Sequence, residues 1–165
     1  MRATRMVAKQ PTSTGAVFCY DKSMNKVIYS GIFFDDAEVD RLRKAFPATL
    51  ANTIELPHVT LRYVARTFWP TYPELYGQEV KVKVVAYASN GRNEGVRVEL
   101  SADDAQLAKM CKDLAVPHIT LAVADGGKPV NTVNLDFQAV DSARQIELVG
   151  KYGAYMSDGS VVCSS

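Results

Sequence analysis

The two histidines of the chain lie in nearly identical pentapeptides. Residues 57–61 read PHVTL and residues 117–121 read PHITL, so the two segments differ only at the central position. A single His-x-Thr is usually a histidine packed in the core beside its threonine. Two of them in matching surroundings are improbable by chance, and they favour a shared chemical role.

Strand geometry predicts where these side chains point. Alternate residues of a β-strand face opposite sides, so His58 shares a face with Thr60, and His118 shares a face with Thr120. The apolar residues between them suit a core beneath helices. If a pseudo-two-fold axis relates the two halves of the chain, both imidazoles and both hydroxyls converge on one cleft. The imidazoles would then lie roughly 5–8 Å apart, each within hydrogen-bonding distance of one phosphate.

Such a set of side chains suits the cleavage of a phosphodiester. A neutral imidazole can take a proton from an attacking hydroxyl, and a protonated one can give a proton to the leaving oxygen. Threonine hydroxyls can donate to the phosphate oxygens, on which negative charge builds up in the transition state. No acidic residue shares these faces within the motifs, and no metal-ligand spacing such as HExxH is present. The motifs therefore favour catalysis without a metal or another cofactor.

The rest of the sequence predicts the elements that position the motifs. Two helices are predicted, over residues 36–46 and 101–115, the second with Ser101 as its N-cap and Asp104 completing a capping box. Each helix is followed by a strand that begins with Pro-His, which indicates an internal duplication. Apolar and alternating runs predict strands at residues 16–20, 26–34, 57–64, 79–87, 95–100, 117–124, 130–137 and 146–156.

The paired motifs, with their apolar flanks and their spacing of about half a small domain, resemble those of the two-histidine (2H) phosphoesterase superfamily. Its members include RNA 2′,3′-cyclic phosphodiesterases, the phosphodiesterase domain of fungal tRNA ligases, enzymes that cleave 2′,5′-oligoadenylate, and phage anti-CBASS proteins that cut cyclic oligonucleotide signals. The resemblance covers roughly residues 26–156. It implies an α+β fold of two lobes related by a pseudo-two-fold axis, with two antiparallel sheets around a central cleft and the helices outside. It also implies that His58 and His118 act as acid and base while Thr60 and Thr120 bind phosphate.

Composition limits the partners. The chain has 165 residues, of which 19 are Lys or Arg and 18 are Asp or Glu, for a formal net charge of +1. Duplex DNA is not an expected partner, because it normally requires a strongly basic domain. A nucleotide or short oligonucleotide is favoured over long RNA for the same reason.

Segment composition also predicts the organisation and the compartment. We expect a flexible N-terminal arm at residues 1–14, one domain over residues 15–156 and a C-terminal tail at residues 157–165. The apolar runs are far shorter than the ~20 residues of a membrane helix, and the N-terminus lacks the apolar stretch of a secretory signal. Three widely spaced cysteines suggest reduced thiols. These features predict a cytoplasmic monomer without a membrane partner.

Four further residues are candidates for substrate binding. Arg62 comes two positions after Thr60 and is predicted to share its face. Tyr29 could stack on a nucleobase if its strand lines the cleft, and Trp69 could do so from the long aromatic loop after the first motif. Lys128 follows two glycines in a turn that could approach a phosphate. Each also has an ordinary explanation as a surface arginine, a core aromatic, a packed loop or a plain turn.

The leading hypothesis is a metal-independent phosphoric diester hydrolase. Its substrate would be a cyclic or 2′-linked phosphodiester in a nucleotide or oligonucleotide, for example a messenger degraded in viral immune evasion. One alternative is an RNA-end-processing 2′,3′-cyclic phosphodiesterase, and another is a non-catalytic nucleotide-binding module. The near-symmetry of the motifs leaves open which histidine is the acid, although a cation at Arg62 beside His58 would favour His58 as the base.

Overall fold

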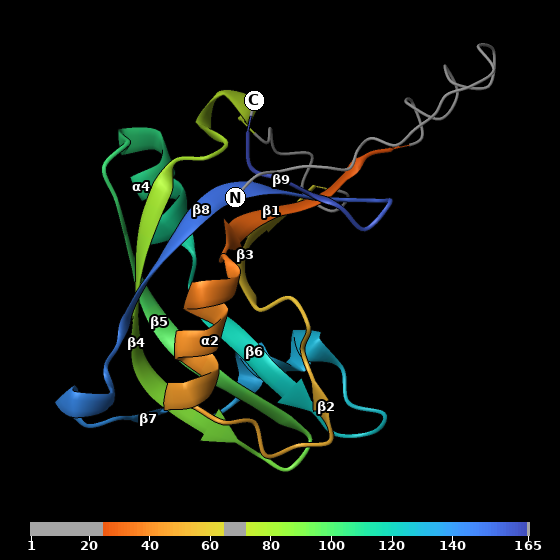
Figure 1. Cartoon of the computed structure of the whole chain (residues 1–165), viewed down its shortest axis with the longest axis vertical. Coiled ribbons are helices and arrows are strands. Elements are labelled where there is room, and N and C mark those ends of the chain that lie inside the picture. Colours follow the sequence, from red (N-terminus) through yellow and green to blue (C-terminus); the bar gives the residue numbers. More distant parts are fainter. Residues whose placement is uncertain (1–24, 65–71, 165) are drawn as a thin grey trace.

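The structure is a computed structural model that describes residues 25–64 and 72–164, and it is an α+β fold. Nine antiparallel strands form one sheet in the order β2-β6-β5-β4-β8-β1-β3, with β7 beside β4 and β9 beside β8 (Figure 1). The strands are β1 (Val27–Phe33), β2 (Asn52–Thr53), β3 (His58–Tyr63), β4 (Glu79–Ser89), β5 (Asn93–Ala102), β6 (His118–Val123), β7 (Gln138–Ala139), β8 (Glu147–Met156) and β9 (Val161–Val162). The α+β class predicted from the sequence is confirmed. The family resemblance implies two sheets, but the described strands form a single one, because β4 pairs with β8.

Among the described residues, two α-helices cover the sheet, α2 (Asp36–Ala45) against β8 and α4 (Ala105–Asp113) against β5. The helices and one face of the sheet enclose the main core, in which the central residues of both motifs, Val59 and Ile119, are fully buried. Three 3₁₀ helices lie in the connections: η1 (Pro73–Leu75), η2 (Pro129–Asn134) and η3 (Ser142–Arg144). Within the described residues, no helix combines the length and apolarity that a membrane span requires.

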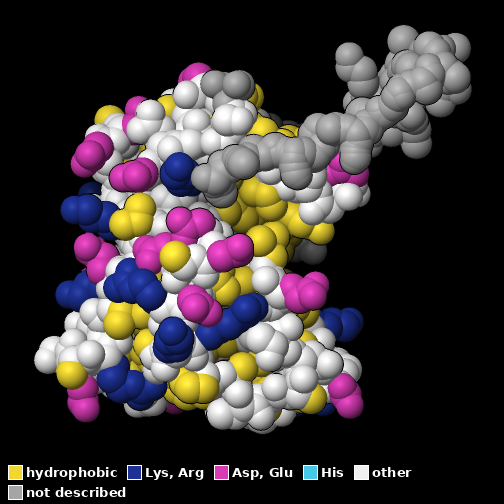
Figure 2. Space-filling view, in the orientation of Figure 1, with side chains coloured by type: hydrophobic (Ala, Val, Ile, Leu, Met, Phe, Trp, Pro, Cys, Tyr) yellow, Lys and Arg dark blue, Asp and Glu magenta, His cyan; other side chains and the backbone are white. Residues whose placement is uncertain are grey.

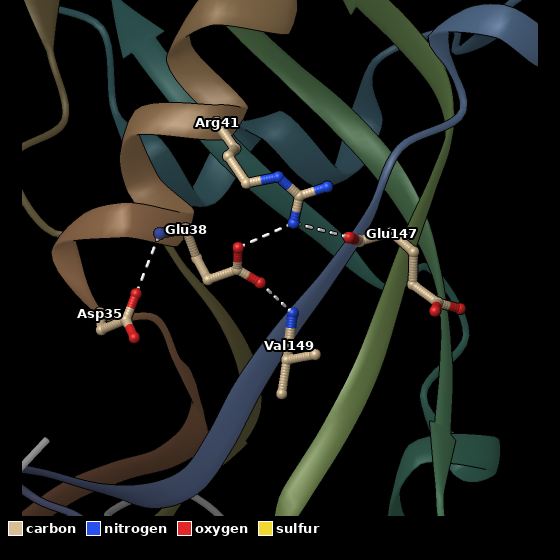
Figure 3. Close-up of polar contacts among 5 residues, drawn as sticks. All are labelled: Asp35, Glu38, Arg41, Glu147 and Val149. Atoms are coloured by element: carbon tan, nitrogen blue, oxygen red, sulfur yellow. Dashed lines mark hydrogen bonds and ion pairs between the residues drawn. The ribbon is translucent and has the colours of Figure 1, made fainter.

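Polar contacts connect the start of α2 to β8 (Figure 3). Asp35 caps the helix by accepting from the backbone N–H of Glu38 at 2.9 Å. The carboxylate of Glu38 accepts from the backbone N–H of Val149 at 2.5 Å and from Arg41 at 2.8 Å, and Arg41 also donates to the backbone carbonyl of Glu147 at 3.0 Å. Because β8 pairs with β1, which in turn pairs with β3, these bonds fix α2 to the part of the sheet that carries the first motif.

The two motif strands lie next to each other although neither hydrogen-bonds to the other. β3 is at one end of the strand order and β6 is next to the other end, yet the two strands are in contact. The sheet must therefore curl, which brings the two His-x-Thr segments together from opposite ends of the order.

Each motif strand contains a β-bulge at the same place. β1 pairs Gly31 with Thr60 and Ser30 with Arg62, which leaves Leu61 without a partner. β5 pairs its own glycine with Thr120 in the same way and leaves the leucine of the second motif without a partner. A bulge re-aims the side chains that follow it, because the alternation of faces shifts by one residue.

A glycine of the neighbouring strand lies opposite the threonine of each motif. It allows β1 to approach β3 closely, and β5 to approach β6 closely. A Cβ on Gly31 would overlap the carbonyl oxygen of Val59. A Cβ on Gly95 would lie 2.8 Å from the carbonyl oxygen of Ile119 and 2.5 Å from Cγ2 of Thr132. Both glycines are therefore required by packing, since neither has a positive φ.

Several sequence predictions were wrong in detail. Ser101 belongs to β5 and does not cap a helix; Asp104 is the N-cap of α4 and accepts from the N–H groups of Gln106 and Leu107. β5 continues to Ala102 because it pairs with β4 over that length. The strand predicted at residues 130–137 is the 3₁₀ helix η2. The strand predicted at residues 16–20 and the N-terminal arm lie outside the described residues.

The close approach at the two glycines gives a test of the fold. Gly31→Ala and Gly95→Ala should each lower the free energy of unfolding by about 1–3 kcal/mol, because a methyl group enters space already filled by backbone. Glu99→Ala, at an exposed position on β5, is the control and should change it by less than about 0.5 kcal/mol. Chemical denaturation measures all three. Alanine variants as stable as the wild type would contradict the close strand approach.

Candidate active site

The four motif side chains line one cavity of about 420 Å³. His58 and Thr60 enter it from β3, and His118 and Thr120 enter it from β6. The volume lies within the range of small-molecule sites. The convergence predicted from the alternation of the two strands is thus present in the structure. The remaining lining residues are mostly apolar or aromatic: Tyr29, Ile54, Leu61, Tyr63, Leu114, Ala115, Val116, Pro129, Val130 and Val133.

Both imidazoles are held by the same backbone contact. Nδ1 of His58 lies 2.8 Å from the carbonyl oxygen of Leu56, and Nδ1 of His118 lies 2.8 Å from that of Val116. A carbonyl can only accept, so each Nδ1 carries a proton and donates it. In the neutral imidazole the basic lone pair is consequently on Nε2. Both histidines can therefore exchange protons only through Nε2.

The two threonines have different partners. Thr60 Oγ1 lies 3.0 Å from Nε2 of His58, and because that nitrogen is the acceptor in the neutral ring, the hydroxyl donates to it. Thr120 Oγ1 lies instead 2.9 Å from Oγ1 of Thr132 and 3.4 Å from the carbonyl oxygen of Pro129. Within the described part of the chain, Nε2 of His118 has no hydrogen-bond partner. The two halves of the site are alike in their histidines and unlike in their threonines.

His58 lies among aromatic rings. The ring of Tyr29 stacks on it with centroids 4.9 Å apart, and the ring of Phe33 lies 5.8 Å away. Tyr155 also stacks on Tyr29, with ring centroids 5.0 Å apart. Burial lowers the pKa of His58 below its ordinary value, the bond to the Leu56 carbonyl opposes this, and the nearby charge of His118 lowers it further. These surroundings favour the neutral form of His58.

Of the four predicted substrate-binding residues, one lines the cavity, two do not, and one lies outside the described residues. Tyr29 lines the cavity and stacks on His58. Arg62 does not line it: the bulge at Leu61 pairs Arg62 with Ser30 and turns Tyr63 into the cavity, so the predicted shared face with Thr60 is not formed. Lys128 is exposed and is also absent from the lining. Trp69 lies outside the described residues.

Other residues of the site gave no usable signal in the sequence. The apolar wall formed by Pro129, Val130 and Val133 comes from η2, a segment predicted to be a strand. Behind that wall lie Asn93, which is 2% exposed, and Thr132, which is fully buried. Buried polar residues cannot be recognised from alternation alone, because the pattern predicts them as exposed.

The charge in the cavity comes from the imidazoles. Over residues 25–64 and 72–164, no Lys, Arg, Asp or Glu side chain lines its wall. In the same ranges, no three His, Cys, Asp or Glu side chains are grouped as a metal site would need. The polar side chains of the described lining are therefore the two imidazoles, the two threonines and the tyrosines Tyr29 and Tyr63, and the rest of the lining is apolar.

Compared with protein-family models and with curated proteins, the sequence matches none of them. The resemblance to the two-histidine superfamily thus remains that of the two motifs and of the order of elements around them.

The surroundings of His58 lead to a titration test. We expect its imidazole to titrate below the ordinary histidine pKa of 6.5. Tyr29→Ala should raise this pKa towards 6.5, because water then reaches the ring. Tyr29→Phe keeps the stack and loses only the 3.5 Å contact between the tyrosine hydroxyl and Nδ1 of His58, so it should shift the pKa less. NMR can follow both imidazoles, and a His118→Gln variant assigns them, since the chain has two histidines.

The same pKa shift has a consequence for stability. Because the folded-state pKa is lowered, the unfolded chain binds the proton more readily, and the free energy of unfolding falls as the pH drops from about 6.5 through the folded pKa. His58→Gln should lack this loss. A His58 that titrates at or above 6.5 in the folded protein would contradict the account of the site.

Proposed function

We propose that the protein is a phosphodiesterase that uses His58 as general base and His118 as general acid on a cyclic or 2′-linked phosphodiester of a nucleotide or short oligonucleotide. The observation that carries the proposal is the pair of Nδ1–carbonyl bonds, which leaves Nε2 as the proton-exchanging atom of both histidines in one cavity. Binding alone requires no such pair of proton-transfer groups. This favours an enzyme over a non-catalytic nucleotide-binding module.

The proposed reaction is an acid–base displacement at phosphorus. Nε2 of neutral His58 removes a proton from a water molecule, whose oxygen forms the new bond to phosphorus. The bond from phosphorus to the leaving oxygen breaks, and that oxygen receives the proton from Nε2 of protonated His118. The products are a phosphomonoester and a free hydroxyl, and proton exchange with solvent restores the two histidines. The hydroxyls of Thr60 and Thr120 donate to the non-bridging oxygens.

The roles of the histidines follow from their surroundings. A base must be neutral when the substrate binds, and burial together with the charge of His118 favours the neutral form of His58. A cation at Arg62 would favour the same assignment, but the bulge in β3 pairs that residue with Ser30, and Arg62 does not line the cavity. The assignment of His58 as the base therefore rests on its burial among aromatic rings.

The proposed substrate is small and carries few charges at the scissile end. The described lining of the cavity has no cationic side chain apart from the histidines, which suits a phosphodiester with its single negative charge. On the face shown in Figure 2, basic and acidic side chains are interspersed. A long RNA would favour a continuous basic track, so an RNA-end-processing enzyme is the less favoured reading.

The two-lobed fold of the two-histidine superfamily is part of the proposal. Its support is the repeated register, in which Gly31 faces Thr60 across one strand pair and Gly95 faces Thr120 across the other, each next to a bulge. A pseudo-two-fold axis that exchanges these strand pairs would account for both.

A substrate panel with matched variants tests the function. The panel contains 2′,3′-cyclic nucleotides, 2′,5′-linked adenylates, 3′,5′-cyclic dinucleotides and ADP-ribose 1″,2″-cyclic phosphate, with products read by chromatography in excess EDTA. We expect turnover of at least one ester. His58→Ala and His118→Ala should each lower its kcat by about 10²–10⁴-fold, and Thr60→Val or Thr120→Val by about 10²-fold, as for one lost donor to developing charge.

The control for these variants is Thr53→Val, an exposed threonine on β2 outside the cavity, which should leave turnover unchanged. Activity that appears only after addition of Mn²⁺ or Zn²⁺ would contradict the mechanism. Binding of a panel member without turnover would instead support the nucleotide-binding module.

A further inference from the structure

A line of hydrogen bonds runs from the buried side of β5 to the second motif. Asn93 Nδ2 lies 2.7 Å from the carbonyl oxygen of Lys128 and 3.1 Å from Oγ1 of Thr132. Thr132 Oγ1 lies in turn 2.9 Å from Oγ1 of Thr120, whose hydroxyl is also within 3.4 Å of the carbonyl oxygen of Pro129. Asn93 and Thr132 are almost fully buried, whereas Thr120 faces the cavity.

The chemistry of the first residue gives this line a direction. The Lys128 carbonyl can only accept, so the Asn93 atom beside it is the amide nitrogen, which can only donate. Thr132 Oγ1 therefore accepts from Asn93. Its own proton is buried and needs an acceptor, and Thr120 Oγ1 lies at hydrogen-bonding distance. Either hydroxyl can donate across this contact, but because Thr120 also has the Pro129 carbonyl within 3.4 Å, donation from Thr132 to Thr120 is the arrangement that gives both protons an acceptor among the described residues. The Thr120 proton is then left for the Pro129 carbonyl or for a ligand.

The side chain of Thr132 fills the space next to Gly95. Its Cγ2 occupies the space in which a Cβ of Gly95 would lie, directly across the strand pair from Thr120. At Gly31, the three described atoms nearest to the position of a Cβ all belong to the backbone of Val59 and Thr60. In that half the threonine donates to His58 instead.

We infer that Thr132 and Asn93 are positioning residues that orient the Thr120 hydroxyl as a donor to a phosphodiester oxygen. The inference rests on the proposed function and deepens it, because it assigns the two motif threonines different duties. Thr120 is a donor prepared before the ligand arrives, and the ligand oxygen replaces the distant Pro129 carbonyl. Thr60 must first release Nε2 of His58.

Binding of dimethyl phosphate, a minimal phosphodiester monoanion, tests this inference without turnover. NMR titration of the two imidazole signals gives the dissociation constant for each variant. Thr120→Val and Thr132→Val should each weaken binding about 10-fold, the size expected for one hydrogen bond to a charged group. The double variant should be no weaker than either single one, because both remove the same bond. Thr132→Ser keeps the hydroxyl and should bind within about two-fold of wild type.

The possible outcomes separate the inference from the function. Wild-type binding that Thr132→Val leaves unchanged, or single effects that multiply in the double variant, would overturn the positioning role and leave the proposed function standing. Failure of dimethyl phosphate to shift either imidazole signal in the wild type would contradict the proposed function itself. If Thr132→Val does not fold, Asn93→Leu removes the first donor at similar volume, and it should weaken binding without adding to Thr120→Val.

Discussion

The hydrogen bond from each imidazole Nδ1 to a carbonyl two residues earlier determines what the cavity can do. It occupies one nitrogen of His58 and one of His118 with backbone, at 2.8 Å in both cases, and so selects Nε2 as the atom that exchanges protons. Because the acceptor precedes the strand that carries the histidine, the orientation of the ring depends on where that strand begins. The Pro-His start of β3 and of β6 is therefore part of the chemistry as well as of the fold.

Two chemically identical side chains need different surroundings to act as acid and base. The structure provides the difference by packing Tyr29 and Phe33 around His58, where burial lowers the pKa of that imidazole. The same division extends to the threonines, since one bonds to its histidine and the other to Thr132. A repeated pair of motifs thus becomes a site with two unlike halves.

The sequence predicted the parts of this arrangement that depend on local pattern. Strand alternation was sufficient to put each histidine on the same face as the threonine of its motif, while convergence of the two faces on one cavity required the further assumption of a pseudo-two-fold axis. It was insufficient for Arg62, because a bulge shifts the alternation and depends on the partner strand. It was also insufficient for Thr132, whose burial depends on the absence of a side chain at Gly95, a residue 37 positions earlier in the chain. The pairing of β4 with β8 into a single sheet is likewise a long-range contact that no local pattern contains.

The most direct test of the central claim compares leaving groups. An ester that releases 4-nitrophenolate needs no proton on its leaving oxygen, whereas a nucleotide ester does. With the nucleotide ester, His58→Ala and His118→Ala should both lose about 10²–10⁴-fold in kcat/KM. With the 4-nitrophenyl phosphodiester, His118→Ala should recover to near wild-type activity and His58→Ala should remain impaired. Rescue of His58→Ala alone would reverse the two roles, and an equal loss in both variants on both esters would contradict acid–base catalysis by this pair.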